Sequence, residues 1–123
     1  MGDGELILLV EDNDTVREAT ANRLESLGYA VLEAGRGPEA ITLLKSGEPI
    51  ALVFSDIVMP GGMTGYDVAE WVQSMKPELE VLLTTGYSEM PLAMSEIAGR
   101  VKVLGKPYTR EQLACALREA LDG

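Results

Sequence analysis

The sequence predicts an α/β fold with a single parallel sheet, and two observations support this. Short apolar runs alternate with longer segments of helical periodicity, which is the pattern of strand–helix units packed around a parallel sheet. The chain has 123 residues, the length of one domain, and five such units fill it from end to end. We therefore expect residues 1–123 to form one domain, with no linker, repeat or effector domain.

The first unit is a strand at residues 5–10 followed by a helix at residues 14–27. Asn13 or Asp14 can serve as the N-cap of this helix. Gly28 is expected to end it, because glycine readily adopts the backbone conformation that closes a helix. One face of the helix carries four residues at helical spacing: Val16, Thr20, Leu24 and Leu27.

The second unit is a strand at residues 29–34 and a helix at residues 37–46. The strand alternates apolar and polar residues less regularly than the others, which favours a place at the edge of the sheet. Pro38 fits the first turn of the helix, where its missing N–H costs no hydrogen bond, and Gly47 ends the helix.

The third unit begins with an apolar run, residues 51–55, which we expect to be a central strand. A glycine-rich loop follows at residues 60–65. The loop leads into a helix at residues 66–75, which ends before Pro77 because proline cannot continue a helix.

The fourth unit contains the segment whose structure the pattern defines least. Its strand is predicted at residues 80–85. In residues 88–100, Pro91 must lie in the first turn of any helix that forms there.

The fifth unit closes the chain with a strand at residues 101–104 and a helix at residues 109–121. Thr109 is followed three residues later by Gln112, which is the pattern of a capping box at the start of a helix. The face expected to pack on the sheet consists of Leu113, Ala116, Leu117 and Ala120.

The composition excludes several classes of function. The net charge of −10, from 20 acidic and 10 basic residues, argues against direct nucleic-acid binding, which requires a basic surface. The chain has no histidine and a single cysteine, Cys115, so it lacks the ligands of an ordinary zinc site and cannot form an internal disulfide. No apolar run approaches the ~20 residues of a membrane span, and no signal peptide is apparent. We expect a cytoplasmic protein without direct membrane contact.

Acidic residues follow two of the predicted strands at the edge where open α/β sheets bind ligands. Glu11 and Asp12 follow the first strand, and Asp56 follows the third. Two carboxylates ~5 Å apart repel by roughly 3 kcal/mol, so a cluster of three favours a divalent cation. Mg²⁺ fits such oxygen ligands, and Mn²⁺ is expected to substitute. Taken alone, residues 11–14 fit a polar loop that caps a helix better than a metal site, and the position of Asp56 at the end of the neighbouring strand is what favours the metal site.

The same edge offers groups suited to phosphoryl transfer. A carboxylate can act as a nucleophile and form an aspartyl phosphate, and Asp56 stands at the end of the central strand. Lys106 supplies a cation, and Pro107 restricts the backbone that aims it. Thr85 offers a hydroxyl to a phosphoryl oxygen, although Thr84 is equally suitable by composition.

These motifs together resemble the receiver domains of response regulators in two-component signalling, over essentially the whole chain. The matching residues are Glu11-Asp12, Asp56 in the segment 56–65, Thr85-Gly86 and Lys106-Pro107-Tyr108, in order and at family spacing. The resemblance implies a flavodoxin-like fold, a three-layer (βα)5 sandwich with parallel strand order 2-1-3-4-5. The chain is most similar to receivers at the C-termini of hybrid sensor histidine kinases, and a stand-alone receiver is the alternative.

The resemblance also implies a role for each matching residue. Asp56 is the expected phosphoacceptor and also a metal ligand. Asp12 is expected to bind Mg²⁺ directly and Glu11 largely through a metal-bound water. The backbone carbonyl of Val58 would complete the protein ligands.

Two further residues are expected to contact phosphoryl oxygens. Lys106 would pair with one oxygen and Thr85 would donate a hydrogen bond to another. The family pattern favours Thr85 over Thr84 because the small Gly86 must follow the threonine directly.

One position departs from the family pattern. Many receivers have a tyrosine or phenylalanine three residues before the lysine, and its rotamer reports phosphorylation. This chain has Val103 there, and Tyr87 and Tyr108 do not occupy that position. We therefore expect phosphorylation to be read out by a shift of residues 87–98 instead of by an aromatic ring.

The expected partner is a histidine kinase or phosphotransfer domain as phosphodonor, and a weak homodimer is compatible with the family. The domain would catalyse its own phosphorylation and dephosphorylation, and a parent hybrid kinase would tether it to the inner membrane. Three alternatives compete. A Mg²⁺-dependent phosphatase typically has a second acid where this chain has Val58, and a flavodoxin-like cofactor binder needs a phosphate loop where this chain has acids. A degenerate receiver would lack part of the acid, hydroxyl and lysine set, which is complete here.

Overall fold

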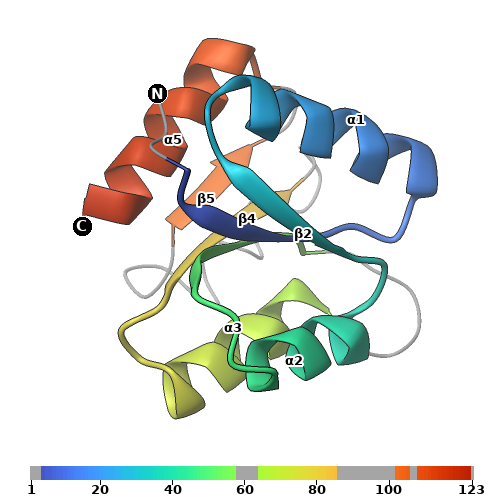
Figure 1. Ribbon diagram of the computed structural model, residues 1–123, viewed down its shortest axis with the longest axis vertical. Helices are drawn as coiled ribbons and strands as arrows, with labels where there is room; N and C mark the ends of the chain where they lie inside the picture. The colour runs from blue at the N-terminus through green and yellow to red at the C-terminus, as the bar shows by residue number, and fades with distance from the viewer. Residues whose placement is uncertain (1–3, 58–63, 86–101, 106–107, 123) are drawn as a thin grey trace.

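The computed structural model describes residues 4–57, 64–85, 102–105 and 108–122, and in this part of the chain a helix follows each strand except the fourth (Figure 1). The strands are β1 (Leu6–Val10), β2 (Ala30–Ala34), β3 (Ile50–Asp56), β4 (Glu80–Thr85) and β5 (Lys102–Gly105). The helices are α1 (Asp14–Ser26), α2 (Gly37–Lys45), α3 (Gly65–Met75) and α5 (Arg110–Asp122). The segment predicted with least definition, residues 88–100, lies outside the described residues.

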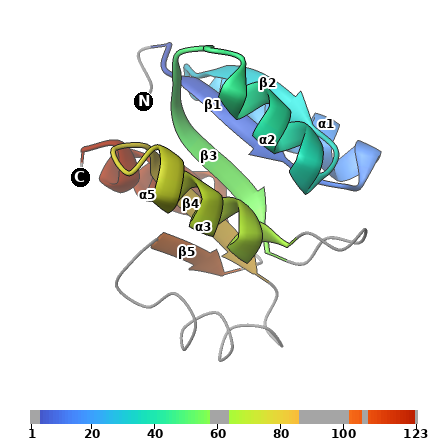
Figure 2. The ribbon, with the colours of Figure 1, turned by 90° about the horizontal axis from the view of Figure 1, so that it is seen from below.

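The strands form one parallel sheet in the order β2-β1-β3-β4-β5. This is the expected order, with β2 at an edge and the apolar β3 at the centre. Helices α1 and α5 cover one face of the sheet, and α2 and α3 cover the other (Figures 1 and 2). The arrangement is the flavodoxin-like three-layer sandwich that the resemblance implied.

Each face of the sheet packs its own apolar cluster, because successive strand residues point to opposite faces. In β1, for example, Leu8 belongs to the cluster under α2 and α3, and Leu9 belongs to the cluster under α1 and α5. The predicted α5 face packs on the sheet, with Leu113, Leu117 and Ala120 fully buried. Two apolar layers therefore hold the central strands from both sides.

The helix ends follow local capping chemistry. Asn13 is the N-cap of α1, and its side chain accepts a hydrogen bond of 3.0 Å from the backbone N–H of Val16. The predicted capping box of α5 is confirmed: the Thr109 N–H donates to Gln112 Oε1 at 2.8 Å, and the Gln112 N–H donates to Thr109 Oγ1 at 3.0 Å. Gly28 follows α1 with a φ of 100°, a conformation that favours glycine.

Two details at helix starts differ from simple pattern reading. On α1, Leu24 and Leu27 are buried, but Val16 on the same face is 43% exposed. The reason is that Val16 lies in the first turn of α1, beside the acidic residues at the sheet edge and not over the sheet. Helix α3 starts at Gly65, one residue earlier than predicted, because Thr64 and Asp67 form a capping box.

The start of β1 and the end of α5 lie on the same side of the molecule (Figure 1). Arg118 of α5 connects them through ion pairs to Glu5 at 3.1 Å and to Asp122 at 3.2 Å. Among the described helices, none combines the length and apolar character that crossing a membrane requires.

Candidate functional site

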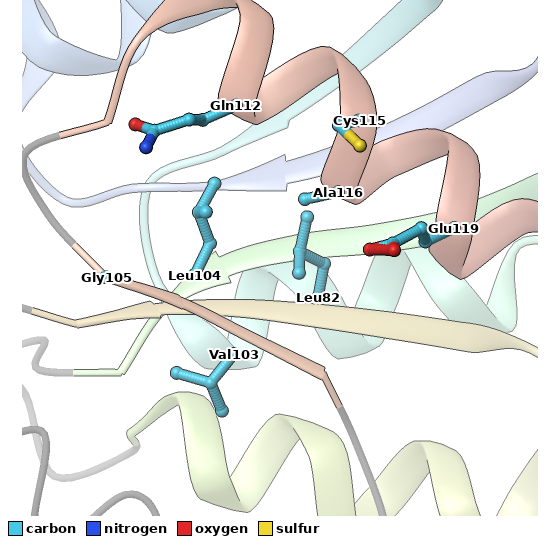
Figure 3. Close-up of a pocket in the computed structure, with 8 residues that line it drawn as sticks. All are labelled: Leu82, Val103, Leu104, Gly105, Gln112, Cys115, Ala116 and Glu119. Carbon is cyan, nitrogen blue, oxygen red and sulfur yellow. The ribbon is translucent and has the colours of Figure 1, made fainter.

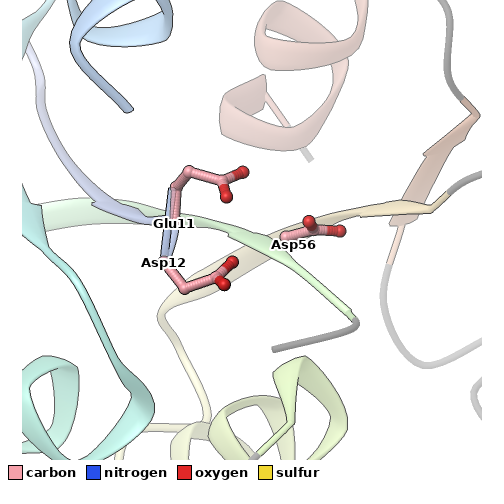
Figure 4. Close-up of side chains that lie close together, drawn as sticks. All are labelled: Glu11, Asp12 and Asp56. Atoms are coloured by element: carbon pink, nitrogen blue, oxygen red, sulfur yellow. The ribbon is translucent and has the colours of Figure 1, made fainter. Parts of the chain in front are cut away.

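Glu11, Asp12 and Asp56 meet at the carboxyl edge of the sheet. One carboxylate oxygen from each lies within 4.8 Å of the others, and the three side chains stand at neighbouring strand ends (Figure 4). The sheet itself brings them together: Glu11 and Asp12 follow β1, Asp56 ends the adjacent β3, and Val10 pairs with Ser55. The convergence predicted from the strand ends is therefore present.

The three acids differ in burial, and this arrangement suits a cation that enters the site from solvent. Glu11 is only 7% exposed, Asp56 is partly buried and Asp12 is exposed. Carboxylates this close repel by about 3 kcal/mol per pair at an effective dielectric near 20, and a divalent cation removes that cost. The donor set consists of hard oxygen atoms, which fits Mg²⁺ or Mn²⁺.

The backbone around Glu11 is held by contacts that cross from one element to another. The Glu11 N–H donates to the Ala34 carbonyl at the end of β2 at 3.0 Å, and its carboxylate accepts from the Asn13 N–H at 3.0 Å. The Glu11 carbonyl accepts a hydrogen bond of 2.9 Å from the guanidinium of Arg17. Arg17 is not predicted from the sequence, because its spacing from the acids matches no recognisable motif.

Asp56 is fixed through the backbone that follows it. The Ile57 N–H donates to the Thr84 carbonyl at 2.9 Å, and the Gly65 N–H donates to the Ile57 carbonyl at 2.8 Å. A Cβ at Gly65 would lie 2.6 Å from the Asp56 carbonyl oxygen and 2.8 Å from the Ile57 Cα. Only glycine therefore lets α3 begin this close to the candidate phosphoacceptor.

The ends of β4 and β5 adjoin the same edge. Thr84 pairs in register with Asp56 and is 4% exposed, whereas Thr85 is one residue further on and pairs with Gly105. Lys106 follows Gly105 directly. Lys106, Val58 and the side chain of Thr85 lie outside the described part of the structure, so the choice of Thr85 over Thr84 stays a prediction.

A small pocket of about 20 Å³ adjoins the acids. A cavity needs about 10–15 Å³ to hold one water, so this one has room for a single molecule. Its lining combines polar and apolar groups: Glu11, Asp56, Ser55, Thr84, Thr20, Tyr108, Val16, Phe54, Leu9 and Val10.

Val103 lies on β5, where many receivers have an aromatic residue. It points away from α5, and the next residue, Leu104, points toward it (Figure 3). Val103 is partly buried against the cluster beneath α2 and α3. It is also one of the residues that line a groove of about 590 Å³ between β5 and α5, to which Cys115 and Glu119 contribute from the helix.

Comparison with known proteins identifies the family. A sequence profile described as the response regulator receiver domain matches residues 7–118. The chain belongs to this family. It is therefore a receiver domain of two-component signalling, and its acidic cluster is compatible with Mg²⁺ binding.

Two relatives from Brucella abortus (strain 2308) differ greatly in length. The receiver domain is 35% identical over 118 residues to "Sensor kinase CckA", covering 94% of this chain and 12% of that protein. It is 34% identical over 116 residues to "Response regulator receiver protein CpdR", covering 94% of this chain and 95% of that protein. Similar receiver sequences thus occur in a long kinase and in a protein about the size of this chain.

Solved structures show the same fold. A response regulator receiver domain protein from Clostridium thermocellum superposes with a TM-score of 0.88 at 25% identity, covering 96% of this chain and 94% of that one. A response regulator receiver protein from Sinorhizobium medicae WSM419 superposes with a TM-score of 0.87 at 26% identity, covering 98% and 97%.

Proposed function

We propose that Asp56 accepts a phosphoryl group from a phosphohistidine of a histidine kinase or phosphotransfer domain, in a reaction that requires Mg²⁺ or Mn²⁺. The observation that supports this most is the cluster of Glu11, Asp12 and Asp56, whose carboxylate oxygens lie within 4.8 Å of one another. A receiver domain needs a nucleophilic carboxylate beside a cation site, and this cluster offers both.

The chemistry assigns a separate task to each group. A carboxylate oxygen of Asp56 forms a bond to phosphorus as the bond from phosphorus to the donor imidazole nitrogen breaks. Asp12 and Glu11 would hold the cation together with Asp56 and the carbonyl of Val58. When bound, the metal supplies charge neutralisation for the carboxylates and the phosphoryl oxygens.

Lys106 and Thr85 would hold the remaining phosphoryl oxygens. The pairing of Thr85 with Gly105 supports this, because it brings the ends of β4 and β5 together beside the acids. A charge-assisted hydrogen bond from Lys106 and a neutral one from Thr85 would orient the group for transfer. The domain would work in the cytoplasm, either free or attached to the inner membrane through a parent kinase.

The direct test is labelling of the purified domain with acetyl phosphate or beryllofluoride. We expect one label, at Asp56, only when Mg²⁺ or Mn²⁺ is present, and the acyl phosphate should be released by hydroxylamine. Asp56→Asn is the matched control because it keeps the side-chain shape and removes the nucleophile. Label retained at the wild-type level in Asp56→Asn, or formed without metal, would overturn the assignment.

Phosphorylation would be transmitted by a shift of residues 87–98 to a partner-binding surface. Val103 supports this hypothesis because valine has no ring that could swing between a buried and an exposed pose. Amide chemical shifts with and without beryllofluoride should change across this segment. Changes limited to residues that touch the phosphoryl group would show another route.

A further inference from the structure

Arg17 connects the acidic loop after β1 to the neighbouring strand β2. Its Nη1 donates to the Glu11 carbonyl at 2.9 Å, its Nη2 lies 2.7 Å from Asp14 Oδ1 and its Nε lies 3.4 Å from Glu33 Oε1. The side chain is only 20% exposed. One guanidinium therefore contacts a loop, a helix and a strand at the same time.

The charge of Arg17 is already balanced outside the acidic cluster. Its two ion pairs are with Asp14 and Glu33, and the hydrogen bond to Asp14 contributes most to raising the pKa of the guanidinium above its usual range. The contact with Glu11 is to the backbone carbonyl and not to the carboxylate. Arg17 therefore does not take the place of a metal ion among the three acids.

The neighbouring backbone leaves room for this side chain. A Cβ at Gly35 would lie 3.3 Å from Arg17 Nη1, closer than most side-chain contacts. Gly35 directly follows β2, and its N–H donates to the carboxylate of Glu39. The loop after β2 thus packs against the guanidinium of Arg17.

The contact at Glu11 matters because of peptide geometry. The Glu11 carbonyl and the Asp12 N–H belong to one planar unit, so a bond that fixes the carbonyl also fixes the point from which the Asp12 side chain starts. The Glu11 N–H donates a hydrogen bond to the Ala34 carbonyl of β2, and the Glu11 carbonyl accepts one from Arg17. Both backbone polar groups of Glu11 are therefore held. Asp12 itself is exposed.

We propose that Arg17 is a positioning residue for the metal site: by holding the Glu11 carbonyl, it fixes the direction of the Asp12 carboxylate toward the cation. This inference rests on the proposed function, in which Glu11, Asp12 and Asp56 bind Mg²⁺. Partners that orient metal ligands typically contribute tenfold or more to affinity, and the effect on a hydrated ion such as Mg²⁺ should lie near the lower end.

The test measures Mg²⁺ binding by calorimetry in wild type, Arg17→Gln and Arg17→Lys at constant ionic strength. We expect Arg17→Gln to bind Mg²⁺ about tenfold more weakly. The direction of the change in Mg²⁺ affinity is decisive. Electrostatics alone predicts the opposite result, because removal of a positive charge near the acids would strengthen cation binding. Arg17→Lys keeps the charge but cannot make the three-way contact, so it should also bind more weakly.

Arg118→Gln is the matched control. Arg118 is also a guanidinium paired with two acids, Glu5 and Asp122, but it lies near the opposite end of β1. This variant should keep the wild-type affinity or bind slightly more tightly. In the metal-free protein, the Asp12 amide resonance should move in both Arg17 variants and stay in place in Arg118→Gln. The Arg17→Lys variant and this resonance keep the test informative if Arg17→Gln does not fold.

The outcomes separate the two proposals. Wild-type Mg²⁺ affinity and an unmoved Asp12 amide in the Arg17 variants would overturn the positioning role alone. Lack of Mg²⁺ binding by the wild type, or unchanged binding by Asp12→Ala, would overturn the proposed metal site and the positioning role with it.

Discussion

Three residues that repel one another are held together by the sheet, so the metal-free site is under electrostatic stress. At the observed separation, each pair of carboxylates among Glu11, Asp12 and Asp56 costs up to about 3 kcal/mol. The cost at Asp12 is smaller because solvent screens an exposed charge. Neutralising Asp12 should therefore relieve part of this stress without disturbing the packing.

We predict that Asp12→Asn stabilises the metal-free domain by about 1 kcal/mol and raises Tm by about 4 °C. Saturating Mg²⁺ should cancel or reverse this difference, because the wild type gains stability from the bound ion. Scanning calorimetry with and without MgCl₂ measures both effects. Glu78→Gln, an exposed acid in the turn before β4, is the charge control and should change little. A lower Tm for Asp12→Asn without metal would contradict the electrostatic account.

Gly65 is a second residue whose effect on the site can be isolated. Alanine normally stabilises a helix relative to glycine, but here its Cβ would meet backbone atoms of Asp56 and Ile57 below 3.0 Å. We predict that Gly65→Ala costs about 1–3 kcal/mol and slows labelling of Asp56. Gly35→Ala is the comparison, because its Cβ would meet the flexible end of Arg17 and should cost less. Equal stability of the two variants would count against the steric explanation.

The acids could be predicted from sequence because each follows an apolar run, and parallel strands place their carboxyl ends at one edge. Arg17 could not be predicted in this way. Its contacts reach Glu11 six residues earlier and Glu33 on another strand, and such contacts depend on strand neighbours that the pattern does not specify. The close approach of Gly65 to Asp56 likewise appears only once α3 is placed.

At the scale of elements, the start of α3 connects local sequence to the site. Thr64 and Asp67 form a capping box: the Thr64 N–H donates to Asp67 Oδ2 at 2.8 Å, and the Asp67 N–H donates to Thr64 Oγ1 at 3.4 Å. The similar box at Thr109 was predicted because Gln112 is one of the usual partners. The box at Thr64 was missed because aspartate is a less usual partner and glycine at position 65 suggested a loop.

We predict that Thr64→Ala destabilises the domain by about 1 kcal/mol, the usual cost of losing an N-cap. Because the Gly65 N–H donates to the Ile57 carbonyl, the Gly65 amide resonance should shift as well. Urea denaturation and amide spectra give the two readouts, and Thr64→Ser should restore both. Thr109→Ala should cost a similar amount through α5. A Thr64→Ser variant as unstable as Thr64→Ala would show that the hydroxyl is not the stabilising group.

At the scale of the whole molecule, the two apolar clusters share the sheet and should unfold together. The sequence pattern identified the edge strand and the central strand, but the full order β2-β1-β3-β4-β5 came from the family resemblance. Apolar periodicity shows which faces are buried and does not identify the neighbours of a strand. Strand β1 pairs with β2 on one side and with β3 on the other, and so connects the edge strand to the centre of the sheet.

We predict that Leu8→Ala and Leu24→Ala, one in each cluster, each cost about 2–5 kcal/mol and leave a single unfolding transition. Both side chains are fully buried, so each truncation leaves a cavity. Circular dichroism and fluorescence of Trp71 should give coincident urea curves. Met75→Ala, at a side chain that is 64% exposed, is the control with little expected effect. Two separate transitions in either core variant would show that the faces unfold independently.

The position of the chain ends has a practical consequence for linking this domain to other proteins. The start of β1 and the end of α5 lie side by side, clamped by Arg118, while the acids stand at the opposite ends of the strands. A reporter or a second module grafted onto either end, or onto both, would leave the path of a phosphodonor to Asp56 open. The domain can therefore be inserted between two other protein segments, because the edge of the sheet that carries the acids faces away from both points of fusion.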